Sequence, residues 1–371
     1  MPQKHILFVL GTRPEAIKLA PLILASYKRE SDFKVTVCIT GQHKEMLNQV
    51  LSFFDIVPDI DLGLMRTNQS LSDLTADAIS SIAKVLTNVK PDVCVVQGDT
   101  TTVLAATIAC FYQKIRVAHV EAGLRTHNLF SPFPEEANRK LTGHLAYYHF
   151  APTLQSKVNL EREGISENVF VTGNTVIDAL FATLAIIEKK GEEPYQNRFS
   201  FLKPDFKTIL VTGHRRESFG APFLQICEAI KFLANNEQVQ IVYPVHLNPN
   251  VQAAVNEVLM NVENVHLIEP LSYPYLVWLM NRSDFILTDS GGIQEEAPSL
   301  GKPVLVMRDF TEREEGITSG NSVLVGTDKD LIIKHAQLLL KDEPVYQRMS
   351  NASNPYGDGH SSARILDILS R

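Results

Sequence analysis

The chain has 371 residues, 44% of them hydrophobic and 21% charged, so it can bury substantial cores and is expected to form about two soluble globular domains. Its 35 basic and 42 acidic residues give a net charge of -7, which argues against the cationic surface that nucleic-acid binding usually requires. The sequence shows neither a signal-peptide core nor an apolar stretch of membrane-spanning length, so we expect a cytoplasmic protein that binds no membrane.

The first half of the chain alternates short apolar runs with longer amphipathic stretches, the pattern of strand–helix units in a doubly wound parallel sheet. The predicted strands cover residues 6–10, 34–40, 93–97, 116–120 and 147–151. The first strand continues into Gly-Thr-Arg-Pro-Glu at residues 11–15, which is typical of a turn into a helix. Unpaired N–H groups, the helix dipole and Arg13 would make this turn an anion-binding loop.

Three acidic residues follow predicted strands or begin predicted helices in this half, namely Asp99, Glu121 and Glu135. Considered singly, Asp99 is equally explained as a helix N-cap and Glu135 as a first-turn carboxylate that suits the helix dipole. Glu121 directly follows a buried strand and has no such structural explanation. If all three converge at the carboxyl edge of one sheet, their like charges would separate their pKa values and provide general acids and bases.

The boundary between the two predicted domains is marked only by a polar stretch. A short strand at 169–172 precedes a predicted helix at 176–189, and a polar segment follows it. We therefore predict a first domain at residues 1–172 and a second at 173–355, with the hinge between 172 and 204. A last helix at 361–370 follows a Pro/Gly break, and the segment 356–371 is expected to cross back onto the first domain.

The second half repeats the strand–helix scheme. The predicted strands cover residues 209–212, 240–244, 265–267, 285–288 and 304–307, with a helix such as 222–234 between them. The first of these strands ends in Gly-His-Arg-Arg-Glu at residues 213–217, a near-copy of the loop at 11–15 that includes Arg215. Two Rossmann-like domains are therefore predicted, whose anion-binding edges would face a central cleft and hold a phosphorylated ligand.

The segment Thr-Asp-Ser-Gly-Gly-Ile-Gln-Glu-Glu at residues 288–296 is the strongest chemical signal in the second half. Ser290 is suited to cap a helix, and Gly291 and Gly292 let the backbone approach a ligand, so three N–H groups could bind a diphosphate. Glu296 lies further along the same helix, where its carboxylate could accept hydrogen bonds from both ribose hydroxyls. The alternative is a helix start whose glycines only permit close packing.

Two histidines and one arginine complete the candidates from residue pattern alone. We refer to the segments at 11–15 and 213–217 as the first and second glycine loops. His214 lies in the second glycine loop and His246 follows the strand at 240–244, so either could donate to a phosphate or protonate a leaving group. Arg313 follows the strand at 304–307, where it could reach a phosphate or be a solvated charge in the run Glu-Arg-Glu-Glu.

The cysteines and the loop motifs exclude common cofactors. All four cysteines lie in apolar stretches without Cys-x-x-Cys spacing, so buried thiols in a reducing compartment are expected: Cys38, Cys94, Cys110 and Cys227. The sequence shows no metal-ligand spacing such as His-Glu-x-x-His, and the loop at 11–15 matches neither the ATP phosphate loop nor the dinucleotide loop. We therefore expect no cofactor and no metal.

Six long motifs, in order along almost the whole chain, resemble those of the non-hydrolysing UDP-N-acetylglucosamine 2-epimerases of bacteria. They lie at residues 11–18, 97–101, 119–125, 134–139, 213–217 and 289–296. The resemblance implies a glycosyltransferase B fold, usually as a homodimer. It also implies interconversion of UDP-N-acetylglucosamine and UDP-N-acetylmannosamine for surface polysaccharides, through elimination of UDP to 2-acetamidoglucal and its re-addition, without oxidation.

The resemblance also assigns roles position by position. The residues that would hold the UDP phosphates are Arg13, Lys18, His214, Ser290, Gly291, Gly292 and Arg313, with Arg215 and His246 as further candidates near the nucleotide. Glu296 would bind the ribose. Asp99, Glu121 and Glu135 would supply the acid and base groups, and His214 is a fourth catalytic candidate.

The sequence departs from the family pattern at several positions. Leu271 and Leu276 stand where relatives place a Gln and a Phe near the uracil. Tyr273 and Tyr275 lie nearby, so a shifted aromatic, with Tyr275 as the candidate, could stack on the base. Glu314 stands where a Pro is common, close to Arg313.

A second departure concerns regulation by a second substrate molecule. Gln42, His43 and Gln69 match an allosteric substrate site of some relatives, but Asn68 stands where those relatives carry an Arg. This departure argues against allosteric activation by the substrate in this chain. The alternatives to the epimerase are a glycosyltransferase of the same fold, a hydrolysing epimerase and a non-catalytic nucleotide-sugar sensor.

Overall fold

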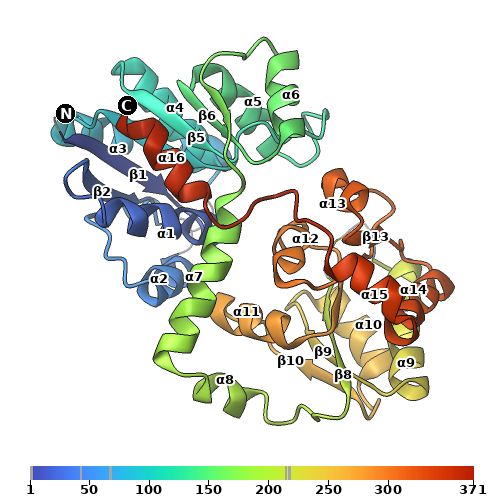
Figure 1. The fold of residues 1–371 in the computed structure, drawn as a ribbon. Helices are drawn as coiled ribbons and strands as arrows, with labels where there is room; N and C mark the ends of the chain where they lie inside the picture. Colours follow the sequence, from blue (N-terminus) through green and yellow to red (C-terminus); the bar gives the residue numbers. More distant parts are fainter. Residues whose placement is uncertain (1–2, 42–43, 67–68, 214, 216–218) are drawn as a thin grey trace. The chain divides into compact units, whose positions relative to one another are not determined.

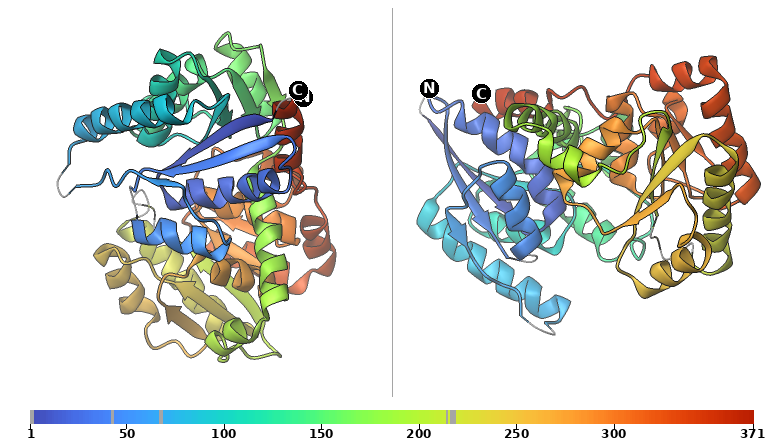
Figure 2. Two further views of the ribbon diagram at one scale, coloured as in Figure 1. Left: turned by 90° about the vertical axis from the view of Figure 1, so that its left-hand side faces the viewer. Right: turned by 90° about the horizontal axis from the view of Figure 1, so that it is seen from below.

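The computed structural model describes residues 3–41, 44–66, 69–213, 215 and 219–371. The chain divides into two compact units: unit 1 comprises Met1–Ala182 and Tyr356–Arg371, and unit 2 comprises Thr183–Pro355. Each unit is built on one parallel sheet with helices on both faces (Figures 1 and 2). The predicted pair of doubly wound parallel-sheet domains is therefore confirmed.

Unit 1 contains a seven-stranded sheet in the order β3-β2-β1-β4-β5-β6-β7. Its strands are β1 (Lys4–Leu10), β2 (Phe33–Ile39), β3 (Ile60–Asp61), β4 (Val93–Gln97), β5 (Arg116–Val120), β6 (Tyr148–Ala151) and β7 (Val169–Val171). Its helices are α1 (Arg13–Tyr27), α2 (Lys44–Phe53), α3 (Leu71–Val89), α4 (Thr101–Tyr112), α5 (Glu135–Leu145), α6 (Leu154–Arg162), the start of α7 (Thr175–Lys190) and α16 (Ser361–Ser370). Contacts group α3 with α4 and α5, and α1 with α2 and α16.

Unit 2 contains a six-stranded sheet in the order β10-β9-β8-β11-β12-β13. Its strands are β8 (Lys207–Thr212), β9 (Val239–Pro244), β10 (Val265–Ile268), β11 (Phe285–Thr288), β12 (Val304–Val306) and β13 (Ser322–Leu324). Its helices are α8 (Glu193–Arg198), α9 (Ala221–Asn236), α10 (Pro249–Leu259), α11 (Tyr273–Arg282), α12 (Gly291–Glu296), the 3-10 helix η2 (Ala297–Leu300), α13 (Glu314–Ser319), α14 (Lys329–Lys341) and α15 (Glu343–Ser350).

The continuous apolar runs explain why these segments form central strands. The last five residues of β1 and all of β4 are fully buried, as expected for parallel strands covered on both faces. All four cysteines are free and buried, as predicted. The strands β3 and β13 were not predicted, because two or three residues are too few to show a periodic pattern.

The C-terminal segment belongs to unit 1. Asp178 of α7 accepts hydrogen bonds from the N–H groups of Ser361 (3.2 Å) and Ser362 (2.7 Å) at the start of α16. Lys4 Nζ donates to the carbonyl oxygen of Leu369 (2.9 Å), so the two ends of the chain lie close together (Figure 2). The division between the units falls within α7, between Ala182 and Thr183, which is later than residue 172 but inside the predicted hinge of 172–204. The first turns of this helix stay with unit 1 because they are bonded to the C-terminal segment.

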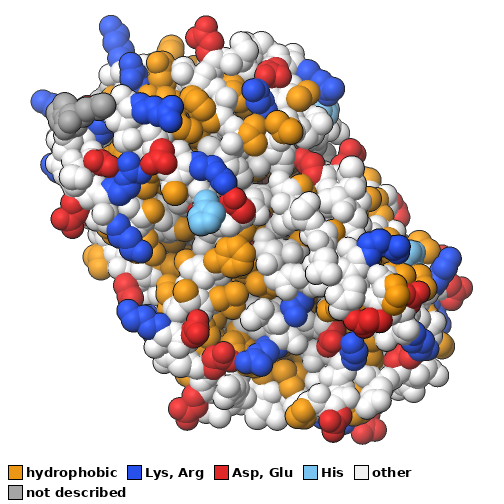
Figure 3. All heavy atoms as spheres, viewed as in Figure 1, with side chains coloured by type: hydrophobic (Ala, Val, Ile, Leu, Met, Phe, Trp, Pro, Cys, Tyr) orange, Lys and Arg blue, Asp and Glu red, His pale blue; other side chains and the backbone are white. Residues whose placement is uncertain are grey.

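The described surface carries charge of both signs. On the face drawn in Figure 3, basic and acidic side chains are interspersed. Among the residues that the structure describes, no helix is both long and apolar enough to span a bilayer.

Candidate active site

The strand order reverses at one strand in each sheet, and ligands of doubly wound proteins bind at the carboxyl ends of strands beside such a point. In unit 1 the reversal lies at β1, between β2 and β4, and in unit 2 it lies at β8, between β9 and β11. The predicted site residues follow these strands: Arg13 after β1, Asp99 after β4 and Glu121 after β5 in unit 1, and Arg215 after β8 and Ser290 after β11 in unit 2.

The glutamate of the first glycine loop has a structural role. Glu15 is 2% exposed, and one of its oxygens accepts hydrogen bonds from the N–H groups of Gly11 (2.6 Å) and Thr12 (2.6 Å). Its other oxygen accepts from the hydroxyl of Thr100, the N-cap of α4. Burial raises the pKa of Glu15, although these hydrogen bonds oppose the increase. Glu15 therefore joins the loop that carries Arg13 to the segment that carries Asp99.

Glu121 adopts a backbone conformation that few non-glycine residues use. Its φ is +64°, in the left-handed region, directly after β5. The Lys18 ammonium forms an ion pair with its carboxylate, and Gln97 Nε2 (2.9 Å) and Asn174 Nδ2 (3.4 Å) donate to the same oxygen. A strained backbone with three donors on one carboxylate oxygen indicates a precisely oriented side chain. The donors Gln97 and Asn174 were not predicted.

The turn that carries Asp99 is held by two neighbouring elements. The Arg139 guanidinium pairs with the Asp99 carboxylate, with Nε at 3.1 Å, and Asn138 Nδ2 donates to the Asp99 carbonyl oxygen (2.9 Å). His119 Nε2 donates to the carbonyl oxygen of Gly98 (2.7 Å). Burial lowers the pKa of His119 to about 4, so its ring is neutral at pH 7. The N-cap role considered for Asp99 belongs to Thr100 instead.

The adjacent glutamates at the start of α5 differ in their surroundings. Glu136 is fully buried and accepts from the N–H groups of Thr126 (3.1 Å) and His127 (3.1 Å), and it also pairs with Arg139 (3.2 Å). Glu135 is partly exposed, and its side chain makes no hydrogen bond or ion pair with any residue in the described ranges. Glu136 is therefore structural, whereas Glu135 remains available for chemistry.

Two of the three predicted carboxylates lie side by side at the carboxyl edge of the unit 1 sheet, and the third begins the neighbouring helix α5. The N–H of Gly98 bonds to the carbonyl oxygen of Val120 (3.0 Å), so Asp99 and Glu121 follow adjacent strand ends. Glu135 lies one helical turn before Arg139, on the side of α5 that contacts Asp99.

The glycines at the start of α12 have different surroundings. A Cβ at Gly291 would lie 2.8 Å from Cζ of Arg313, so the absence of a side chain at residue 291 lets this guanidinium pack directly against the backbone. A Cβ at Gly292 would meet no atom of the described chain closer than Glu296 Oε2, at 4.0 Å. Close packing therefore explains why residue 291 is a glycine, but it does not explain the glycine at residue 292. Ser290 is the N-cap residue, and its N–H bonds to Thr288 Oγ1 (3.0 Å).

Arg313 is held in a network of ion pairs and is not a solvated charge. Its side chain is 11% exposed and pairs with Glu295 (3.0 Å) and Glu312 (2.9 Å). Glu312 also pairs with Arg308 (2.7 Å) and lies 3.9 Å from Arg215 Nη2. Burial favours a higher pKa for Glu312, but the charges of Arg313 and Arg308 outweigh it and lower that pKa to about 2. The network gathers three arginines around Glu312 and places one of them, Arg313, against the Gly291 backbone.

Asp289 is bonded to Arg215, one of the described residues of the second glycine loop. Its carboxylate accepts from the N–H of Arg215 (2.8 Å), and its carbonyl oxygen accepts from Arg215 Nε (3.0 Å). Tyr243 donates its hydroxyl to the carbonyl oxygen of Gly213 (2.7 Å) on the other side of the loop. His214 lies outside the described residues. His246 is exposed, and its Nδ1 accepts from the N–H of Asn248 (3.1 Å) in a local turn.

The residues assigned to the base and ribose lie around the start of α11. Glu296 is 5% exposed, and its Oε1 accepts a hydrogen bond from the hydroxyl of Tyr273 (2.6 Å). The ring of Tyr275 lies in an aromatic cluster, with centroid distances of 4.7 Å to Tyr195 and 6.3 Å to Phe199. Leu271 and Leu276 flank this segment and are both partly exposed.

Of the residues considered for an allosteric site, the structure describes only Gln69. Its Nε2 donates to the Asp77 carboxylate of α3 (3.0 Å). Gln42, His43 and Asn68 lie outside the described residues. In the described ranges, no three His, Cys, Asp or Glu side chains form a group that could hold a metal ion.

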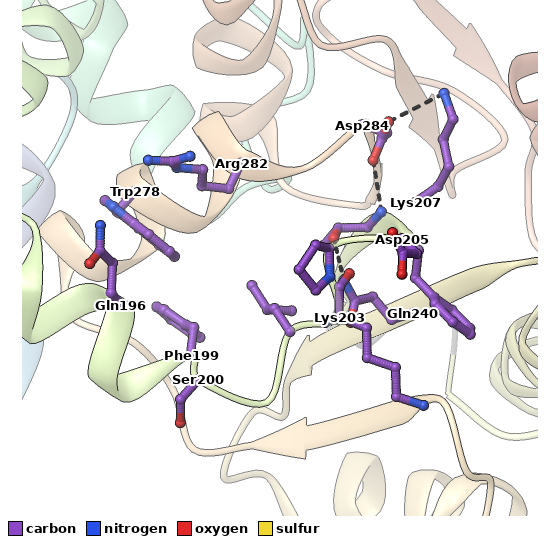
Figure 4. A pocket seen from close by; sticks show the side chains of 14 residues that line it. Gln196, Phe199, Ser200, Lys203, Asp205, Lys207, Gln240, Trp278, Arg282 and Asp284 are labelled. Atoms are coloured by element: carbon purple, nitrogen blue, oxygen red, sulfur yellow. Dashed lines mark hydrogen bonds and ion pairs between the residues drawn. The ribbon is translucent and has the colours of Figure 1, made fainter.

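A hollow of about 680 Å³ lies in unit 2 at the opposite edge of the sheet (Figure 4). Its lining includes Lys207, Gln240 and Asp284, which mark the amino ends of β8, β9 and β11. Its polar groups bond to one another: Asp284 accepts from the N–H of Thr208 (2.7 Å) and pairs with Lys207 (3.4 Å). We therefore place the candidate site at the carboxyl edge and not in this hollow.

These features define a two-unit parallel α/β protein with an arginine–glutamate network beside a glycine turn in one unit and carboxylates at adjacent strand ends in the other. A search of protein families matches residues 25–370 to the family described as UDP-N-acetylglucosamine 2-epimerase. UDP-N-acetylglucosamine 2-epimerase of Escherichia coli K12 is 56% identical over 368 residues, covering 98% of each chain. The chain therefore belongs to the UDP-N-acetylglucosamine 2-epimerase family.

Solved structures agree with this membership. The UDP-GlcNAc 2-epimerase of Neisseria meningitidis, solved bound to UDP-GlcNAc, is 50% identical, with a TM-score of 0.91 over 98% of this chain and 99% of that one. The glycotransferase of kitacinnamycin is 14% identical, with a TM-score of 0.68 over 100% of this chain and 99% of that one, so it shows only a shared fold. The predicted glycosyltransferase B type of fold is consistent with both structures.

Proposed function

We propose that this protein interconverts UDP-N-acetylglucosamine and UDP-N-acetylmannosamine without hydrolysing them. The observation that carries the proposal is the placement of Asp99 and Glu121 at adjacent strand ends in a member of this family, with Glu135 one helical turn before the arginine that pairs with Asp99. A nucleotide-sugar sensor would not require these three carboxylates together. The proposal includes a cytoplasmic homodimer that supplies surface polysaccharide synthesis.

In the first step, a carboxylate of unit 1 removes the proton from carbon 2 of the sugar. The bond between carbon 1 and the diphosphate oxygen breaks, the electron pair leaves with UDP, and 2-acetamidoglucal forms. Re-addition of UDP to carbon 1, with protonation of carbon 2 on the other face, completes the epimerisation without net oxidation. Positioned carboxylates can move such protons at neutral pH.

In the proposed complex, unit 2 stabilises the leaving diphosphate. The Ser290 N–H is already bonded to Thr288 Oγ1, so the N–H groups of Gly291 and Gly292 and the Arg313 guanidinium would bind its oxygens. Arg13, Arg215 and His214 would add positive charge or hydrogen bonds. Fixed donors stabilise developing charge without reorganising during the reaction. Lys18, which the resemblance assigns to phosphate, pairs with Glu121 here, so its ammonium would serve both groups.

Reaction in deuterated water tests the proposed function. Incubation with UDP-N-acetylglucosamine is expected to place deuterium on carbon 2 of both intact UDP-sugars, observed by mass spectrometry and proton NMR. Free UDP and N-acetylmannosamine as the main products would instead identify a hydrolysing epimerase. Turnover that requires an added acceptor would identify a glycosyltransferase.

Gly292→Ala is expected to weaken UDP binding about tenfold or more without lowering the melting temperature. The added methyl has space in the described chain, and alanine is favourable in a helix, but it would hold a diphosphate away from the backbone N–H groups. Titration calorimetry with UDP and thermal unfolding measure the two effects. Ser290→Ala, which keeps the backbone N–H, serves as the milder comparison. Unchanged UDP affinity in Gly292→Ala would place the diphosphate elsewhere.

A further inference from the structure

Tyr273 and Glu296 form a buried pair that links two elements of unit 2. Tyr273 is the first residue of α11 and is 4% exposed, while Glu296 is the last residue of α12 and is 5% exposed. The phenol hydroxyl donates to Glu296 Oε1 at 2.6 Å. A hydrogen bond to a charged group at this distance is strong, so it restricts the orientation of the carboxylate.

The second carboxylate oxygen lies on the side of the glycine turn. Apart from its chain neighbours and the backbone of α12, Glu296 Oε2 is the only atom of the described residues within 4 Å of the position that a Cβ on Gly292 would occupy. The carboxylate therefore points one oxygen to Tyr273 and the other toward the backbone proposed to bind the diphosphate. A ribose, which lies between base and diphosphate in a nucleotide, would meet a carboxylate that is already oriented.

We propose that Tyr273 is a positioning residue that gives this site its preference for ribonucleotides over 2′-deoxyribonucleotides. The inference rests on the proposed function, in which Glu296 binds the ribose. The phenol fixes the carboxylate so that both ribose hydroxyls can donate to it, and pre-organisation of this kind reduces the entropy lost on binding. Without the phenol hydroxyl, the carboxylate can rotate, and the second sugar hydroxyl loses its defined acceptor.

Titration calorimetry with UDP and 2′-deoxy-UDP on the whole protein tests the inference. The wild-type protein is expected to bind UDP about tenfold or more tightly than 2′-deoxy-UDP, the scale of one hydrogen bond to a charged group. Tyr273→Phe is expected to lower this ratio at least about threefold, mainly by weakening UDP binding. Glu296→Ala is expected to abolish the preference.

Tyr243→Phe is the matched control. Tyr243 is also buried in unit 2, and the substitution removes one phenol hydroxyl that donates at 2.7 Å, but to the Gly213 carbonyl oxygen. It can weaken the binding of both nucleotides, but their ratio is expected to stay within about twofold, because no sugar contact changes.

The outcomes separate the inference from the function on which it rests. Equal binding of both nucleotides by the wild-type protein would overturn the ribose role of Glu296 and the inference together. A preference that disappears in Glu296→Ala but persists in Tyr273→Phe would keep the ribose role and overturn the role of Tyr273. An equal change of the UDP to 2′-deoxy-UDP affinity ratio in Tyr243→Phe would also overturn the role of Tyr273, because the effect would then follow from the loss of any buried phenol.

Discussion

Glu121→Gln is expected to lower kcat at least about a hundredfold, the scale of a lost general acid or base. The substitution keeps the size of the side chain but removes the charge to which Lys18, Gln97 and Asn174 are directed. Steady-state kinetics with UDP-N-acetylglucosamine and exchange of deuterium at carbon 2 measure the loss of the chemical step.

UDP binding distinguishes a chemical defect from a structural one. Because the proposed diphosphate contacts lie mainly in unit 2, Glu121→Gln is expected to bind UDP with nearly wild-type affinity. Turnover close to that of the wild-type protein would remove Glu121 from the mechanism. A loss of UDP affinity that matches the loss of turnover would instead indicate a role in binding.

Asp99→Asn is expected to lower kcat by a similar factor, at least about a hundredfold. The Asp99 carboxylate pairs with Arg139 through Nε and Nη2, and its main chain is held by Asn138 and by the contact of His119 with Gly98. An asparagine retains these main-chain contacts, so the turn should keep its position while the acid or base function is lost. The measurement is turnover together with UDP affinity.

Asp32→Asn is a matched control for Asp99→Asn. Arg29 contacts Asp32 through the same two atoms, Nε (2.9 Å) and Nη2 (2.9 Å), on one carboxylate oxygen, away from the candidate site. Turnover of this variant is expected to stay within about twofold of the wild-type value, as is usual for exposed ion pairs. If both variants lose activity equally, the loss follows from a broken arginine–aspartate pair and not from catalysis by Asp99.

The sequence was sufficient to predict the architecture, because each central strand is a continuous apolar run followed by a polar turn. The predicted strands at 93–97, 116–120 and 285–288 coincide with β4, β5 and β11. The edge strands β3 and β13 were missed, since their two or three residues carry no periodic signal. The division at residues 182/183 falls inside the predicted hinge of 172–204, but its exact place within α7 could not be predicted, because the contacts of α7 with the C-terminal segment join residues far apart in the chain.

The candidate site was only partly predictable, because some of its residues show a local sequence signal and others are placed by the tertiary fold. Glu121 was singled out because no local role explained it, and the structure gives it a left-handed backbone and three donors. Its partners, and Arg139 beside Asp99, could not be predicted, because these contacts span 24 to 103 residues of sequence and depend on the tertiary fold. Glu15 and Glu136 have buried structural roles that local spacing did not reveal.

A crystal structure with UDP-N-acetylglucosamine bound tests the central claim most directly. We expect the diphosphate oxygens within hydrogen-bond distance, about 3 Å, of the N–H groups of Gly291 and Gly292. We also expect Asp99, Glu121 and Glu135 around carbon 2 and the ring of the same sugar. A structure in which Gly291 and Glu121 line unrelated cavities would contradict the proposed mechanism.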